Sequence, residues 1–259
     1  MLAALGAACI EPEIVEYLKT PPDRSTLSQL IARTGLPVRA AVRERGTPSH
    51  ELGLDDPSRS DDELLDAMTR HPILINRPIV VAPNAVALCR PSDIVLDILP
   101  RRLQSDLRKE DGARFLRDEP TSGDDPEMRA ALGDAQLPAD DLCEPGRRFF
   151  RYRTLDGRTV GFGCFELYGS DTLLRSIVVP PEARSARVGR NLVPLLMRRA
   201  FDAGARRAFV LTTTAKEFLE RLGFERILRE SAPATILATR QAAGLCPSTA
   251  PMLERRLTL

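Results

Sequence analysis

The feature that most constrains the fold is a charged, irregular segment near the middle of the chain. Residues 100–125 contain the run RRLQSDLRKEDGARFLRDEPTSGDD, and regular apolar patterns lie on both sides of them. Such a segment predicts a tail and linker between two domains. A chain of 259 residues is long enough for two domains of about 100–150 residues each. We therefore predict two domains, residues 1–115 and 116–259.

Charge and hydropathy argue against several classes of protein. Lys and Arg total 37 against 36 Asp and Glu, which gives a formal net charge of +1. This balance does not support a broad surface for nucleic acid or for an anionic membrane. No apolar stretch approaches the roughly 18–20 residues of a membrane-spanning helix. We expect a cytoplasmic protein that binds neither nucleic acid nor membranes.

The cysteines indicate reduced thiols rather than a metal site. They are scattered without a Cys-x-x-Cys pair, and the chain has only two histidines. This spacing does not suit a Cys/His zinc site, and we predict no metal. An odd, scattered set is typical of a reducing cytoplasm. The five cysteines are Cys9, Cys89, Cys143, Cys164 and Cys246.

The first half shows the element order of a thioredoxin-like α/β layer. Apolar spacing, capping residues and turn signals predict strand, helices, hairpin and helix in that sequence. The predicted elements are a strand over 14–18, a helix from Asp23 or Ser25 through Arg33 that ends at Gly35, a helix over 38–46, a helix that begins at Ser60, a hairpin within 73–91 and a closing helix over 92–99.

Several phrases of this half resemble the glutaredoxin-coupled arsenate reductases. They are EYLKTPPDR, ELGLDDP, HPILINRPIVV, LCRPSDIVLDILP and KEDG, and the match runs from about Ile10 to Gly112. The resemblance implies reduction of arsenate to arsenite, with glutathione as reductant and glutaredoxin as partner. It also implies a cis peptide bond before Pro78.

The same resemblance places three arginines around the arsenate oxyanion: Arg43, Arg77 and Arg90. Planar guanidinium groups offer paired donors to the oxygens of a tetrahedral anion. Their positive charge would also lower the pKa of a nearby thiol and stabilise an arsenic–sulfur adduct.

One motif of that family does not occur in the chain. The family places its nucleophilic cysteine in a Cys-x-Thr-Ser-Arg loop that follows a first strand, and these 259 residues contain no such motif. Cys9 lies towards the far end of the helix that should follow this loop, and its sequence neighbours include no cation. We therefore do not expect Cys9 to replace the nucleophile, and we expect Cys89 to be a packing residue.

Two explanations for the missing motif stay open. Either the gene begins upstream of Met1, or the reductase half is a degenerate remnant. As written, the sequence predicts a truncated thioredoxin-like domain, in which the strand over 14–18 lacks its central neighbour. The codons upstream of Met1 would decide between them.

The second half has a different element order, which is typical of a mixed α/β domain. Alternating apolar runs around an Asp156-Gly157 turn predict a hairpin, and a third strand follows it. The predicted elements are a helix that begins at Asp124 or Asp125, a short helix within 138–142, strands over 147–155, 159–169 and 172–179, a loop over 180–190, a helix over 191–204, a strand over 208–214, a helix over 215–223 and a strand over 225–230.

From about residue 115 to the end, the chain resembles the GNAT acyltransferases. The phrases LLRSIVV, VLTTTAKEFLERLGF and LCPSTAPM are similar to the subgroup found beside arsenic-resistance genes. The resemblance implies transfer of acetyl from acetyl-CoA to a small amine acceptor. Backbone N–H groups of a loop that opens a helix would bind the pyrophosphate, and the strand end at Ile177 and Val179 would bind the pantetheine arm. The loop residues are Arg184, Arg187, Val188, Gly189 and Arg190.

This half also departs from its family. Arg187 stands where the usual loop has its middle glycine; its side chain either obstructs the phosphate or binds it, and a decayed, non-binding loop is a third reading. The tyrosine often used as general acid is replaced by Leu219. Glu166 is the candidate for relaying a proton through water, or else an ordinary edge-strand carboxylate. Tyr168 is the candidate donor to the leaving thiolate.

Three consecutive threonines, Thr212, Thr213 and Thr214, either line the acceptor pocket or cap the next helix. Taken together, the sequence predicts an α/β protein for arsenic detoxification. It would join a truncated thioredoxin-like arsenate reductase domain, inactive without its cysteine segment, to a GNAT-type N-acyltransferase domain. The alternative is a non-catalytic remnant that binds oxyanions or acts as a scaffold.

Overall fold

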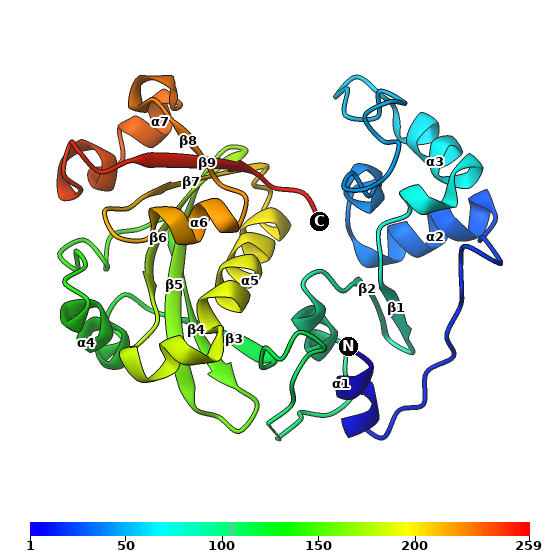
Figure 1. Ribbon diagram of the computed structural model, residues 1–259, viewed down its shortest axis with the longest axis horizontal. Helices are drawn as coiled ribbons and strands as arrows, with labels where there is room; N and C mark the ends of the chain where they lie inside the picture. The colour runs from blue at the N-terminus through cyan, green and yellow to red at the C-terminus, as the bar shows by residue number, and fades with distance from the viewer. Residues whose placement is uncertain (105) are drawn as a thin grey trace. The chain divides into compact units, whose positions relative to one another are not determined.

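The computed structural model describes residues 1–104 and 106–259 (Figure 1). Its contacts divide the chain into two compact units, residues 1–103 with Leu259 and residues 104–258. Both units are of the α/β type, as predicted. No helix in the described residues is long and apolar enough to cross a membrane.

The first unit combines short helices with one hairpin. β1 and β2 pair antiparallel from Ile79 opposite Leu88 to Ala82 opposite Ala85, which confirms the predicted hairpin. The elements are α1 (Leu2–Ala7), α2 (Arg24–Thr34), η1 (Val38–Ala41), α3 (Asp61–Arg70), η2 (Pro72–Leu74), β1 (Ile79–Ala82), β2 (Ala85–Leu88) and η3 (Ser92–Asp97).

Local capping signals set the ends of its two longest helices. The Asp23 carboxylate accepts a hydrogen bond from the backbone N–H of Thr26 at 2.7 Å, and α2 ends at Gly35 with φ 71°. Ser60 and Glu63 form a reciprocal capping box at the start of α3. The predicted starts of both helices and the predicted stop of α2 are confirmed. The apolar faces of α2 and α3 then pack into one core.

The strand predicted over residues 14–18 is wrong. Ile14 and Val15 are each 65% exposed, and no strand in the described part of the chain pairs with this segment. Extended backbone persists as a strand only when a neighbour accepts and donates its hydrogen bonds. The alternating apolar pattern alone therefore could not form the element.

Two predicted helices of the first unit are shorter than expected. Residues 38–46 form only the 3₁₀ turn η1, because Val42 then extends to make a bridge with Ile75. The closing helix is also of the 3₁₀ type and ends at Asp97. The bridge to Ile75 ends the first helix early, and the second segment forms tighter 3₁₀ hydrogen bonds in place of α-helical ones.

The second unit is built around a seven-stranded sheet. The strand order is β3-β4-β5-β6-β7-β9-β8, and all neighbours are antiparallel except β6 and β7. The elements are β3 (Leu116–Thr121), α4 (Pro126–Asp134), β4 (Arg147–Thr154), β5 (Thr159–Tyr168), β6 (Asp171–Val178), η4 (Pro181–Ala186), α5 (Val188–Asp202), β7 (Arg207–Leu211), α6 (Lys216–Arg221), β8 (Glu225–Ile227), η5 (Arg229–Ser231), α7 (Ala234–Leu237), η6 (Gln241–Leu245) and β9 (Met252–Arg256).

Two strands at opposite sides of this sheet were not predicted. β3 pairs with β4 over its whole length, so residues 100–125 are not only a tail and linker. It is an edge strand whose polar residues hid the pattern, while Leu116 is buried. β9 lies between β7 and β8, although its residues are mostly charged. The short helix expected within 138–142 is a turn.

Two glycines of β5 allow α5 to lie against the sheet (Figure 1). A Cβ atom on Gly161 would lie 2.7 Å from Cδ1 of Leu192, and one on Gly163 would lie 3.0 Å from Cδ2 of Leu196. Any larger residue would push the helix away from β5. These glycines therefore position the start of α5 close to the sheet.

β6 separates from β7 halfway along its length. The two strands pair only from Asp171 opposite Arg207 to Leu174 opposite Val210. Ser176 then has φ 50°, and the register between β5 and β6 shifts at this point, as in a β-bulge. The backbone of residues 175–178 consequently lies outside the β6–β7 ladder.

Candidate functional site

In the first unit, two segments that lie far apart in the sequence run side by side. Val42 bridges Ile75, and the backbone N–H of Arg43 donates to the carbonyl of Leu74 at 2.7 Å. This pairing brings the predicted residue Arg43 next to the segment that contains Arg77.

A buried asparagine connects the other two predicted arginines. Asn76 is fully buried, and its Oδ1 accepts hydrogen bonds from the backbone N–H of Arg77 at 3.0 Å and from Nη1 of Arg90 at 2.9 Å. Sequence reasoning missed Asn76; the only signal was its place directly before the Arg77-Pro78 pair. That peptide bond is cis, as predicted.

The arginines share one region of positive charge. Burial lowers the pKa of Arg90, and the charges of Arg43, Arg77 and Arg45 lower it further. The structure thus brings the three predicted arginines together and adds Arg45 to them. In the described residues no carboxylate forms an ion pair with Arg43 or Arg77. The guanidinium of Arg77 lies over the Tyr17 ring, with Cζ 5.7 Å from the ring centroid. Uncompensated guanidinium groups are suited to bind an anion.

The two thiols of this unit have different surroundings. Cys89 is 1% exposed, and its thiol donates to the carbonyl of Ala87 at 3.7 Å, as expected of a packing residue. Cys9 is exposed, and Nη2 of Arg101 donates to its Sγ at 3.0 Å. A cation thus lies next to Cys9 although its sequence neighbours include none, because Arg101 comes from a distant part of the chain.

In the second unit, the predicted pyrophosphate loop leads into α5. Arg187 lies in the left-handed region with φ 56°, where glycine has no Cβ penalty. Its Nη1 donates to the carbonyl of Asp111 at 2.7 Å, and Nε of Arg184 donates to the carbonyl of Val179 at 3.0 Å. Both guanidinium groups are thus held by backbone oxygens around the start of the helix.

The first turn of α5 is fixed by close packing. Val188 is buried, and Arg190 is exposed. A Cβ atom on Gly189 would lie 3.0 Å from Cζ of Phe218 in α6, so only glycine fits here without a shift. Ile177 of β6 and Val179, which follows this strand, are half-buried at the end of the segment that leaves β7.

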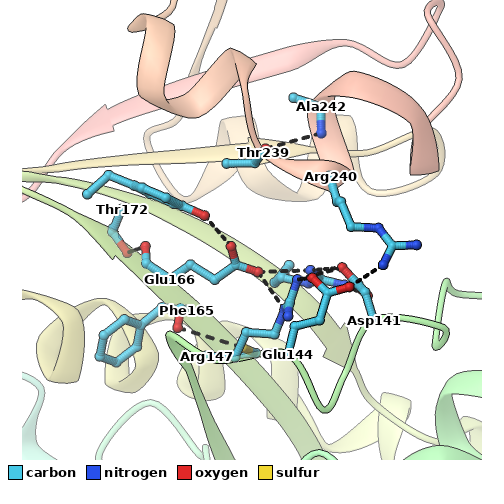
Figure 2. A network of polar contacts seen from close by, with 12 residues as sticks. Asp141, Glu144, Arg147, Phe165, Glu166, Thr172, Thr239, Arg240 and Ala242 are labelled. Atoms are coloured by element: carbon cyan, nitrogen blue, oxygen red, sulfur yellow. Dashed lines mark hydrogen bonds and ion pairs between the residues drawn. The ribbon is translucent and has the colours of Figure 1, made fainter.

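Glu166 belongs to a buried network of ion pairs (Figure 2). Its Oε1 accepts from Nε of Arg147 at 3.0 Å and from Nη1 of Arg175 at 2.8 Å, and its Oε2 accepts from the hydroxyl of Tyr168. β5 lies between β4 and β6, so the edge-strand reading of Glu166 is wrong.

The network extends to the loop after α4. Asp141 accepts from Nη1 and Nη2 of Arg175, both at 2.6 Å, and from Nη2 of Arg147 at 2.8 Å. Nη2 of Arg147 also donates to Glu144 at 3.0 Å, and Glu144 accepts from Arg240. Sequence reasoning missed these groups, because their contacts depend on pairing across the sheet.

Burial and charge act in opposite directions within this network. Burial alone would raise the pKa of Asp141, but hydrogen bonds and charge from Arg175 lower it below its usual value. Burial alone would lower the pKa of Arg175, yet Asp141 and Glu166 raise it. Burial, and then the hydrogen bond to Glu166, raise the pKa of Tyr168. Tyr168 therefore keeps its proton at neutral pH.

Thr212 and Leu219, two further positions considered in the sequence, contribute to the structure around α6. Oγ1 of Thr212 accepts from the backbone N–H of Ala215 at 2.9 Å and closes the turn before α6, and Leu219 is buried in that helix. Among the described residues, no three His, Cys, Asp or Glu side chains converge as metal ligands would.

Comparison with known proteins relates each unit to a family. The model of the ArsC family matches residues 13–98. An arsenate reductase of Rhizobium meliloti is 62% identical over 115 residues, which are 44% of this chain and 82% of that protein. The chain belongs to the arsenate reductase family. An arsenate reductase of Escherichia coli K12 is 52% identical over 106 residues, 41% of this chain and 75% of that protein.

The model of the acetyltransferase (GNAT) family matches residues 113–224. The chain is thus a fusion of an arsenate reductase unit with a GNAT unit. Both families consist of enzymes. Among solved structures, the arsenate reductase of Vibrio cholerae is 42% identical and covers 38% of this chain and 84% of its own, with a TM-score of 0.36. A Mycobacterium tuberculosis protein in complex with CoA is 18% identical to this chain. The match covers 54% of this chain and 99% of that protein, with a TM-score of 0.44.

Proposed function

We propose that this fusion protein serves arsenic detoxification: its first unit binds arsenate, and its second unit transfers acetyl from acetyl-CoA to a small amine. The observation that carries the proposal is the arginine cluster around Asn76, in a unit of the arsenate reductase family. In this cluster the oxygens of arsenate accept hydrogen bonds from Arg43, Arg77 and Arg90. Glutathione and glutaredoxin supply the electrons for reduction to arsenite in this family.

The test of the arsenate site is binding of arsenate to the full chain, measured by calorimetry. Arg77→Gln should weaken binding about tenfold or more, because a charge-assisted hydrogen bond contributes about 1.5–3 kcal/mol. Arg33→Gln, an exposed arginine at the end of α2, is the matched control and should bind as the unaltered chain does. Unchanged arsenate affinity in Arg77→Gln would refute the site.

The second candidate function is oxyanion binding without catalysis. It is favoured by the thiols, since Cys89 is buried and the 259 residues contain no Cys-x-Thr-Ser-Arg motif. We expect this chain to form no arsenite when it is incubated with arsenate, glutathione and glutaredoxin. If arsenite forms and Cys9→Ser abolishes it, Cys9 is the nucleophile and the candidate is rejected.

Acetyl-CoA fits the second unit at two features. The start of α5 presents backbone N–H groups and the positive end of a 15-residue helix to the pyrophosphate, with Arg184, Arg187 and Arg190 around it. The backbone at Ile177 and Val179, outside the β6–β7 ladder, can bind the pantetheine arm. When bound, acetyl-CoA supplies an activated acyl thioester.

Two side chains of the network would then move protons. Tyr168 holds its proton at neutral pH and would donate it to the leaving thiolate. Both oxygens of Glu166 already accept hydrogen bonds, so Glu166 would relay the amine proton through a water molecule.

The test of the acyltransferase is formation of CoA from acetyl-CoA with a panel of amines, measured by chromatography. Tyr168→Phe should lower kcat about 100-fold and leave the Kd of CoA unchanged, because general acid catalysis contributes about 10²–10⁴-fold. Tyr17→Phe, in the first unit, is the control. Joint replacement of Arg184 and Arg187 by Ala should weaken CoA binding; unchanged affinity would reject the phosphate role of the loop.

A further inference from the structure

We propose that Arg147 and Arg240 form a binding site for a small oxyanion such as a carboxylate, and that Glu144 of the chain occupies this site in the structure. The site itself stands on the geometry of the network. Its assignment to the acid group of an amine acceptor rests on the proposed acetyl transfer.

The first argument is an unsatisfied donor on a buried guanidinium. The side chain of Arg147 is only 5% exposed. Its Nε donates to Glu166, and its Nη2 donates to Asp141 and Glu144. Its Nη1 is buried and has no hydrogen-bond partner in the described residues. Buried donors are nearly always paired, so this atom indicates a missing acceptor.

The shape of the guanidinium indicates what that acceptor is. Nη1 and Nη2 lie side by side and can make two parallel hydrogen bonds to two oxygens of one anion. Glu144 meets only Nη2 of Arg147, at 3.0 Å. An oxyanion in the place of Glu144 could accept from both nitrogens and satisfy Nη1.

The second argument is that Arg147 and Arg240 share one exchangeable carboxylate. Arg240 precedes η6, and its Nη1 donates to Glu144 (Figure 2). The side chain of Arg240 is 54% exposed and forms an ion pair with Glu144. An anion that displaces Glu144 would therefore meet both guanidinium groups.

Burial shows which carboxylate can leave. The side chains of Asp141 and Glu166 are 0% and 7% exposed, whereas that of Glu144 is 40% exposed. Glu144 can thus turn into water, while the other two stay in the core.

The charge balance also favours exchange. The network holds three carboxylates and three guanidinium groups: Asp141, Glu144 and Glu166 with Arg147, Arg175 and Arg240. When Glu144 leaves, one positive charge is uncompensated, and a bound monoanion restores neutrality.

The position of this site suits an acceptor that carries an acid group. Arg147 donates to Oε1 of Glu166, and Tyr168, the proposed proton donor, binds Oε2 of the same carboxylate. An amine that carries a carboxylate or another small oxyanion would thus be anchored one side chain away from the proposed proton donor.

The experiment measures sulfate binding to the full chain by calorimetry, in an Arg77→Gln background so that the arginine cluster of the first unit contributes less. Glu144→Gln should bind sulfate at least tenfold more tightly than this parent, because the internal competitor loses its charge. Adding Arg240→Gln should reverse the gain. Glu127→Gln is the matched control, since Glu127 is also half-exposed and paired to an arginine, Arg151, outside this site.

Equal sulfate affinity of the Glu144→Gln and Glu127→Gln variants would overturn the proposal. Far-UV circular dichroism shows whether the variants fold. A second measurement uses Glu144 in its natural form: the ¹⁵Nε resonances of Arg147 and Arg240 should shift with sulfate in the Arg77→Gln chain. No shift of either resonance would equally overturn the site.

Two amines identify the source of the oxyanion. Glycine and methylamine differ by one carboxylate, and glycine alone should displace sulfate if the acid group belongs to an amine acceptor. If neither amine displaces sulfate, the site binds a free inorganic anion and the acceptor assignment is rejected. Sulfate binding without any acetyl transfer would reject the proposed acyltransferase function but keep the site.

Discussion

Replacement of Arg175 by methionine should destabilise the second unit by about 3–5 kcal/mol at neutral pH, the usual effect of removing one partner of a buried ion pair. The Arg175 side chain is 2% exposed and makes three hydrogen bonds of 2.6–2.8 Å, two to Asp141 and one to Glu166. Without it, Arg147 alone compensates both of these buried carboxylates. Methionine preserves much of the apolar stem, so the loss comes mainly from charge.

The loss should depend on pH. In the unaltered chain the lowered pKa of Asp141 contributes stability that is present at neutral pH and is lost as pH falls through that lowered value. In Arg175→Met, burial should raise the pKa of Asp141, so its protonated form becomes the stable one as pH falls. The difference between the two chains should therefore be largest at pH 7 and smaller at pH 5.

The measurement must report on the second unit alone. The chain contains no tryptophan and has two units, so hydrogen exchange of peptides from β4, β5 and β6, followed by mass spectrometry over a urea series, is the suitable assay. Arg207→Met is the matched control. Arg207 also makes two hydrogen bonds to an aspartate, Asp171, at 2.8 and 3.0 Å, but its side chain is 44% exposed.

We expect Arg207→Met to lose less than about 1 kcal/mol, as surface ion pairs do. The reasoning would be refuted if Arg175→Met also lost less than about 1 kcal/mol at pH 7, or if its loss were the same at pH 5. Either result would mean that the carboxylates find other partners when the guanidinium is removed.

Three further predictions concern single positions. Gly189→Ala should destabilise the second unit by about 1–3 kcal/mol in thermal unfolding, because its Cβ would meet the Phe218 ring, whereas Gly133→Ala, with open space around it, should not. Arg187→Gly should stabilise this unit by about 1 kcal/mol by removing a left-handed Cβ; calorimetry with CoA then shows whether the side chain aids or obstructs binding. Ser60→Ala should destabilise α3 by about 1 kcal/mol, measured by hydrogen exchange.

Much of the secondary structure could be predicted because its causes are local. Asp23 and Ser60 begin helices with their own side chains, and Gly35 ends one in a conformation that suits glycine. The Asp156-Gly157 pair turns the chain between β4 and β5. Each of these signals acts over only a few residues, so neighbouring sequence suffices to identify it.

The errors have non-local causes. The apolar pattern of residues 14–18 is that of a strand, but no described strand lies beside it to pair with. β3 shows the reverse: its polar pattern is weak, yet β4 pairs with it along its whole length. A strand depends on its neighbour as much as on its own residues, and the sequence does not specify the neighbour.

The candidate sites divide in the same way. Family phrases in the sequence were enough to select Arg43, Arg77 and Arg90, but only the folded chain showed that buried Asn76 holds two of them. Apart from Glu166 and Tyr168, the groups of the ion-pair network had no sequence signal, because they come from separate segments of the chain. Residue types and short spacings determined which chemistry this chain could carry. The pairing of distant segments decided which of those side chains meet, since burial and charge compensation arise only where the chain folds back on itself.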